Sequence, residues 1–183
     1  MTVVTAPVAG RVVALADVPD AVFAGQLVGA GVAIEPSAPP AGRGAGAGPG
    51  AEPGDGAESG DGAEPGDGAG TGAGLVTVVS PIAGEVVKLH PHAFVVVHDS
   101  GVGVLVHVGI DTVKLGGSGF ELAVAEGATV AAGELVVTFD PAVVAEAGYS
   151  AVCPVVVLDS APDTVSQEAV GTSVAPGDAL FTV

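Results

Sequence analysis

The chain has 183 residues, with 21 acidic and four basic side chains and a formal net charge of −17. So few cations cannot neutralise the phosphates of a nucleic acid, which excludes DNA-binding and RNA-binding classes. The single cysteine, Cys153, excludes a fold held together by internal disulfides. The first residues lack the regions of a secretory signal, and no apolar run reaches the roughly 18 residues of a membrane span. We therefore expect a cytoplasmic protein.

Short runs rich in valine recur along the chain between Gly, Pro and Asp residues. Such runs are typical of an all-β protein, here an antiparallel β-sandwich or barrel-sandwich. Helical periodicity is weak, so we expect only very short helices, at 141–147 and 163–169. The predicted strands lie at 11–15, 27–34, 75–79, 85–89, 94–97, 102–108, 135–139, 152–158 and 180–183.

Residues 37–74 differ from the rest of the chain. The hexapeptide Gly-Ala-Glu-Pro-Gly-Asp stands at 50–55, recurs with Ser for Pro at 56–61, and returns unchanged at 62–67. The segment contains no Leu, Ile, Val or aromatic residue, so it cannot bury enough apolar surface to offset the entropy of ordering it. We predict a disordered insertion at 37–74 within a single β domain formed by 1–36 and 75–183.

Two pairs of segments repeat within the predicted domain. Ala-Pro-Val-Ala-Gly at 6–10 is echoed by Ser-Pro-Ile-Ala-Gly at 80–84, and 129–135 resembles 173–180. The second pair places a glycine in a tight turn between apolar strands, where a positive φ is easily reached. This repetition predicts a sandwich with pseudo-repeated hairpins and says nothing about chemistry.

The four histidines, His90, His92, His98 and His107, lie within one short part of the chain. In an extended chain, His90 and His92 would share one face. His107 lies in an otherwise apolar strand, where a single histidine is usually a hydrogen-bonded core residue. The clustering favours a chemical role, for which spacing alone leaves two alternatives. One is a zinc site made by His90, His92, His107 and Asp111, and the other is phosphoryl transfer through a phosphohistidine.

Four segments carry a resemblance to a known family. They are 91–101 (Pro-His-Ala-Phe-Val-Val-Val-His-Asp-Ser-Gly), 105–113 (Leu-Val-His-Val-Gly-Ile-Asp-Thr-Val), 17–24 and 116–120. Together they resemble the glucose-type enzyme IIA of the phosphoenolpyruvate-dependent sugar phosphotransferase system. The similarity extends over essentially all of the chain outside the insertion. It implies an antiparallel β-sandwich with two histidines in a shallow apolar depression.

The resemblance also implies roles for individual residues. His107 matches the histidine that accepts a phosphoryl group from phosphorylated HPr and passes it to a cysteine of enzyme IIB or IICB, a membrane-associated partner. His92 matches the neighbouring histidine that stabilises the phosphoryl group and is needed for its onward transfer. Asp111 matches an acidic residue that meets a cationic side chain of HPr. Regulatory partners are also known in the family.

Several residues and alternatives remain open at this stage. His90 stands where relatives often have threonine; it either takes over that residue's role of holding the His92 ring or is simply solvated, and we expect it to be solvated, while His98 receives no role. Cys153 is expected to be a small buried hydrophobe. No cofactor is expected to be required. The alternative function is a zinc-binding β-sandwich, either a hydrolase or a structural module, with His92 and His107 as metal ligands.

Overall fold

The computed structural model describes residues 1–37 and 74–183. The predicted insertion at 37–74 therefore lies outside the described residues, apart from the residue at each of its ends. In the described ranges the protein is mainly β, with every strand pair antiparallel. Among these residues, no helix is long or apolar enough to cross a membrane.

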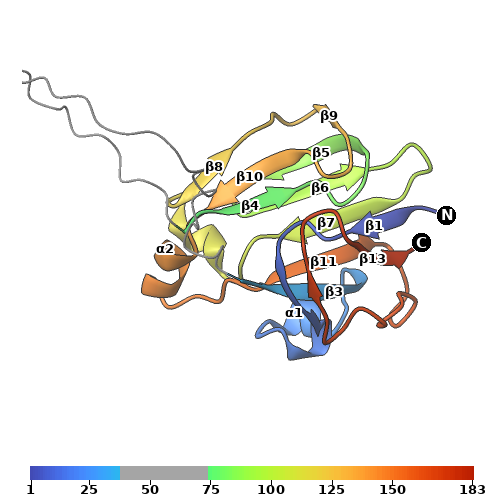
Figure 1. The fold of residues 1–183 in the computed structure, drawn as a ribbon, viewed down its shortest axis with the longest axis horizontal. Coiled ribbons are helices and arrows are strands. Elements are labelled where there is room, and N and C mark those ends of the chain that lie inside the picture. Colours follow the sequence, from blue (N-terminus) through green and yellow to red (C-terminus); the bar gives the residue numbers. More distant parts are fainter. Residues whose placement is uncertain (38–73) are drawn as a thin grey trace, which may run out of the picture.

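The strands form three sheets (Figure 1). The largest has eight strands in the order β12-β2-β3-β11-β7-β6-β5-β9, a second has the order β4-β10-β8, and β1 pairs with β13. The strands are β1 Val3–Thr5, β2 Gly10–Ala14, β3 Gly29–Pro36, β4 Val76–Val79, β5 Gly84–His90, β6 Ala93–Val97, β7 Gly103–His107, β8 Phe120–Leu122, β9 Thr129–Val130, β10 Leu135–Phe139, β11 Cys153–Leu158, β12 Ser173–Val174 and β13 Ala179–Thr182.

The all-β fold with antiparallel sheets is confirmed, and each predicted run overlaps one of these strands. The remaining strands, β1, β8, β9 and β12, have only two or three residues each. Runs so short carry no visible alternation of apolar and polar residues, so the sequence does not predict them. Most valines of the longer strands are buried, and the larger of two core clusters contains the fully buried Phe94, Phe139, Ile34 and Ile82.

Helical structure is limited, in the described ranges, to α1 (Ala21–Ala24), α2 (Pro141–Glu146) and 3₁₀ turns at Leu15–Asp17 and Thr112–Leu115. The helix predicted at 141–147 is confirmed as α2. Asp140 caps it by accepting a hydrogen bond from the Ala142 amide at 2.9 Å, and proline occupies its first turn.

The helix predicted at 163–169 is wrong, because these residues form turns. Asp163 adopts a left-handed conformation with φ 59°, which cannot start a right-handed helix. Its side chain and amide are both bound to Gln26, at 3.0 Å each. These bonds between distant parts of the chain outweigh the weak local helical preference.

The first pair of sequence repeats occupies equivalent positions in the fold. Each proline-containing segment leads directly into a strand, β2 at Gly10 and β5 at Gly84. The two segments bind each other reciprocally, since the Thr5 amide donates to the Pro81 carbonyl at 2.9 Å and the Val79 amide donates to the Pro7 carbonyl at 2.8 Å. The pseudo-repeat is therefore a structural unit as well as a sequence pattern.

The second pair of repeats closes the unit in the same way. Gly133 donates to the Ser80 carbonyl at 2.8 Å, and Gly177 donates to the Ala6 carbonyl at 2.9 Å. Both glycines have positive φ, 84° and 92°, as the hairpin prediction requires. Each turn thus fastens one copy of the proline segment.

Candidate functional site

His92 and His107 are brought together by the pairing of β6 with β7. Ala93, the first residue of β6, pairs with His107, the last residue of β7. The amide of Val108 then donates to the His92 carbonyl at 2.7 Å, which holds the turn before β6 against the end of β7. The two imidazole rings lie with their centroids 5.4 Å apart and their planes at 60°.

His92 lies in a tight hairpin turn and not in an extended strand. His90 ends β5 and pairs with Ala93, so Pro91 and His92 form the two-residue connection between β5 and β6. His90 and His92 therefore do not lie in one extended strand, which is the condition under which the sequence predicts a shared face. The two rings nevertheless stack on each other across the turn.

The glycine-rich segment 116–120 supports this turn. A Cβ atom on Gly117 would lie 3.5 Å from the Pro91 ring, so the segment passes directly against the connection that carries His92. Gly117 also has a φ of 91°, which a side chain would make unfavourable.

The His107 ring has a fixed tautomer. Its Nδ1 is hydrogen-bonded to the carbonyl oxygen of Gly109, and because a carbonyl only accepts, Nδ1 must carry the proton. In the neutral ring, Nε2 then has a free lone pair. Gly109 is required here: its φ is 76°, and a Cβ atom would lie 2.5 Å from Cγ2 of Thr112 and 2.9 Å from the Ser150 carbonyl oxygen.

Helix α1 forms the other side of the site. The Asp20 carboxylate caps the helix by accepting from the amides of Val22 at 2.8 Å and Phe23 at 3.2 Å. The Phe23 ring is 7% exposed and contacts the His107 ring edge-on, with 5.3 Å between centroids. The sequence places 17–24 in the family resemblance but indicates no role for Asp20 or Phe23. A local signal for this helix is nevertheless present in the sequence, because Asp20 is a favourable N-cap residue and the aromatic Phe23 follows it.

Burial favours the neutral form of both histidines. Burial lowers the pKa of His107 below its usual 6.5, although the Gly109 carbonyl and the charges of Asp20 and Asp111 act in the opposite direction. Burial also lowers the pKa of His92, aided by the nearby charges of His107 and His90. A neutral imidazole is a nucleophile, whereas an imidazolium is not, so the site favours the reactive form near neutral pH.

Asp111 lies at the edge of the site. It has a left-handed conformation with φ 61°, its side chain is 52% exposed, and it forms an ion pair with Lys114 at 3.1 Å. An exposed pair of this kind contributes little to stability. The carboxylate is therefore available to a partner's cation, and the prediction of such a contact stays a prediction.

Of the two remaining histidines, His90 lies at the site and His98 lies outside it. The His90 ring is exposed, as expected for a solvated residue, but it is also stacked on His92 with centroids 5.5 Å apart and planes at 14°. His98 comes after the opposite end of β6, where its Nδ1 is bound to the amide and hydroxyl of Ser100.

Cys153 is fully buried at the start of β11. Its thiol donates to the Ala151 carbonyl at 3.3 Å, and burial raises its pKa to about 12. Such a thiol does not ionise under ordinary conditions, so it behaves as the buried hydrophobe that the sequence predicts.

The residues fit a zinc ion only in part. Imidazole suits zinc, and His92 and His107 face each other, but three or four protein ligands are usual. Within the described ranges, no group of three or more His, Cys, Asp or Glu side chains is arranged to hold a metal ion. The zinc alternative therefore stays a prediction that would need a ligand from outside this site.

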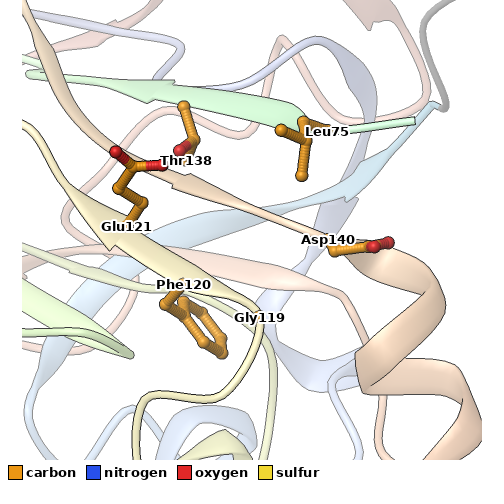
Figure 2. Close-up of a pocket in the computed structure, with 6 residues that line it drawn as sticks. All are labelled: Leu75, Gly119, Phe120, Glu121, Thr138 and Asp140. Atoms are coloured by element: carbon orange, nitrogen blue, oxygen red, sulfur yellow. The ribbon is translucent and has the colours of Figure 1, made fainter. Parts of the chain in front are cut away.

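A separate pocket of about 280 Å³ lies near α2 (Figure 2). Glu121 of β8 and Thr138 of β10 stand opposite each other in it, while the Phe120 ring points away from them and stacks on Phe139. None of the histidines lines this pocket, so it does not belong to the candidate site.

Comparison with known proteins agrees with the resemblance. A family model described as phosphoenolpyruvate-dependent sugar phosphotransferase system, EIIA 1, matches residues 2–43 and 62–162. The glucose-specific EIIA component of Bacillus cereus is 31% identical over 176 residues, which span 95% of this chain and 84% of that protein. The glucose-specific EIIBCA component of Corynebacterium glutamicum is 31% identical over 182 residues, which are 21% of its length.

A solved structure supports the same assignment. The glucose permease IIA from Mycoplasma capricolum superposes with a TM-score of 0.72 and 28% identity, covering 98% of this chain and 93% of that chain. The fold, the family model and the relatives all agree. The chain therefore belongs to the glucose-type EIIA family of the phosphoenolpyruvate-dependent sugar phosphotransferase system.

Proposed function

We propose that the protein is a phosphocarrier that accepts a phosphoryl group from phosphorylated HPr on Nε2 of His107 and passes it to a cysteine of enzyme IIB. The observation that carries the proposal is the bond from His107 Nδ1 to the Gly109 carbonyl. This bond leaves Nε2 as the nitrogen with a free lone pair, on a ring whose pKa is lowered by burial.

Each step exchanges one bond to phosphorus for another. In the first, the new bond from His107 Nε2 to phosphorus forms as the bond from the HPr histidine to phosphorus breaks. In the second, a cysteine thiolate of enzyme IIB attacks phosphorus and the bond to His107 breaks, which returns the neutral ring. Neither step changes an oxidation state, so the protein needs no redox cofactor for this chemistry.

The position of His92 supports its role in this transfer. Its ring lies beside that of His107, with centroids 5.4 Å apart. A hydrogen-bond donor placed there stabilises charge that shifts between the oxygens during in-line displacement. We propose that His92 stabilises the phosphoryl group and assists its departure to the cysteine.

The proposed partners are inferred from the charge of the chain and from its relatives. A formal net charge of −17 favours encounter with a locally basic surface such as that expected for HPr. Asp111 is the residue that we propose to meet a cationic side chain of HPr. The acceptor is proposed to be an EIIB domain, since relatives include a glucosamine-specific EIICBA component of Bacillus subtilis and the EIIBCA component already described.

Labelling with phosphoenolpyruvate tests the acceptor. The protein is mixed with enzyme I, HPr and radiolabelled phosphoenolpyruvate, and acid-labile label is expected on the wild-type chain and is expected to be absent from His107→Gln. His98→Gln is the matched control, because it removes a histidine outside the site. Undiminished labelling of His107→Gln would refute the acceptor assignment.

A second experiment tests His92. The His92→Gln chain is expected to accept label on His107 but to transfer it slowly to an EIIB domain. Delivery by this variant at the wild-type rate would refute the role assigned to His92.

A further inference from the structure

The His92 ring lacks the hydrogen bonds that usually orient a histidine. Among the described residues, no hydrogen bond to either of its ring nitrogens is present, whereas the His107 ring is held by the Gly109 carbonyl. Rotation about the bond that carries an imidazole is broad, with few preferred angles. The orientation of His92 must therefore come from the groups packed against it.

His90 supplies a flat surface for this purpose. Its ring is nearly parallel to that of His92, with planes at 14° and centroids 5.5 Å apart. On the His107 side the angle is 60° at 5.4 Å. The three rings thus form a row in which His92 is the middle member.

Strand pairing fixes the backbone positions from which these rings project. His90, the last residue of β5, pairs with Ala93, the first residue of β6. Ala93 pairs in turn with His107, the last residue of β7, so the ends of three adjacent strands lie side by side. Pro91 stiffens the connection between the first two histidines, because its ring fixes φ. The stack therefore results from strand register as well as from side-chain choice.

We propose that His90 is a positioning residue, whose stacked ring holds the His92 imidazole in the orientation that serves a phosphoryl group on His107. The inference rests on the proposed phosphocarrier function. It assigns to His90 the role of holding the His92 ring, the alternative to the simply solvated residue that the sequence analysis expects. It also distinguishes His90 from His98, which is bound to its own turn at the far end of β6.

A stacked aromatic pair makes a modest but measurable contribution. Its usual strength corresponds to a two- to tenfold change, about the effect expected on the rate of delivery from phosphorylated His107 to an EIIB domain. Acceptance from HPr should change little, because the nucleophile on His107 keeps its own hydrogen bond.

Two variants of His90 separate stacking from direct contact with the phosphoryl group. His90→Phe keeps an aromatic face but has no hydrogen-bond donor. His90→Gln has a donor at similar reach but no aromatic ring. Positioning by stacking predicts that Phe retains near wild-type delivery and that Gln reduces it about two- to tenfold. His98→Gln serves as the control for loss of a histidine elsewhere.

Nuclear magnetic resonance supplies a readout that does not depend on transfer. Contacts between the ring protons of His92 and His107 are expected to persist in His90→Phe and to weaken in His90→Gln. The proposal is overturned by wild-type delivery together with unchanged ring contacts in His90→Gln, or by the reverse order, with Gln active and Phe impaired. Failure of the phosphocarrier function itself would appear separately, as absence of label on wild-type His107.

Discussion

The two copies of the proline segment, 6–10 and 80–84, share their hydrogen bonds but differ in the connections to which their strands lead. Each copy runs into a strand and is fastened by an equivalent glycine turn. After β2, the chain takes a long connection through a 3₁₀ turn and α1 before β3. After β5, it takes the two-residue turn Pro91-His92 to β6.

We call the two proline segments (6–10 and 80–84) and the two glycine turns that bind them (129–135 and 173–180) the frame. The difference shows that the frame and the site are distinct parts of the molecule. The first connection brings Phe23 to one side of His107, and the second brings His92 to another. The repeats themselves contribute no ring to this cluster. We infer that substitutions in the frame change stability, whereas substitutions in the connections and at the end of β7 change phosphoryl transfer. Paired variants, one in each part, test this division.

Gly109→Ala is expected to have the largest effect. The added Cβ would lie 2.5 Å from Thr112 and would occupy a φ of 76°, so the carbonyl that holds His107 must shift. Backbone strain of this kind costs about 1–3 kcal/mol. Displacement of the nucleophile should slow labelling of His107 by roughly 10²-fold.

The control for this variant is Gly133→Ala in the frame. Gly133 has a similar φ of 84°, but nothing lies within 4 Å of an added Cβ. It should lose stability in urea unfolding without loss of labelling. Equal loss of labelling in both variants would contradict the division between frame and site.

Phe23→Leu is expected to have the next largest effect on transfer. The change keeps most of the buried volume and costs about 1 kcal/mol, but it removes the ring that contacts His107. Phe139→Leu, in the fully buried core of β10, is the matched variant. We expect both to lower the unfolding midpoint and only Phe23→Leu to slow labelling; if Phe139→Leu slowed it equally, the effect would be one of stability.

The lowered pKa values of His92 and His107 predict a pH dependence of stability. Below the ordinary pKa of 6.5, the unfolded chain binds protons that the native site resists, so the free energy of unfolding falls as the pH decreases. Above 6.5 this contribution is fully present. Urea unfolding at about pH 7.5 and about pH 5.5 should show a larger loss for the wild type than for the double variant His92→Gln/His107→Gln. Equal losses would show that burial does not suppress protonation at this site.

The smallest effects are expected in the frame turns. Glu134 accepts from the Ala131 amide at 2.8 Å, and Asp178 accepts from the Ala175 amide at 2.8 Å. Replacing either by alanine should cost about 1 kcal/mol, equally in the two copies, and should leave labelling unchanged. Unequal losses in thermal unfolding would show that the two copies are not energetically equivalent.

The sequence predicts the longer strands, the repeats and the two central histidines because each leaves a local signal. The run of valines marks β6, and Gly109 stands at a fixed distance after His107. The contact of Phe23 with His107 and the stacking of His90 on His92 across a two-residue turn have no such signal. They depend on where α1 folds back and on the register of β5 with β6, which are properties of contacts between distant segments. The failed helix at 163–169 has the same origin, since Gln26 binds Asp163 from the other end of the chain.

The Gly109 carbonyl, on this mechanism, makes Nε2 of His107 the phosphoryl acceptor. The most direct measurement is nuclear magnetic resonance of the ¹⁵N-histidine-labelled protein, phosphorylated by HPr, with phosphorus and ring nitrogens observed together. We predict a single phosphohistidine, at residue 107, with phosphorus bonded to Nε2 and a proton retained on Nδ1. Phosphorus on Nδ1 of His107, or on any other histidine, would contradict this mechanism.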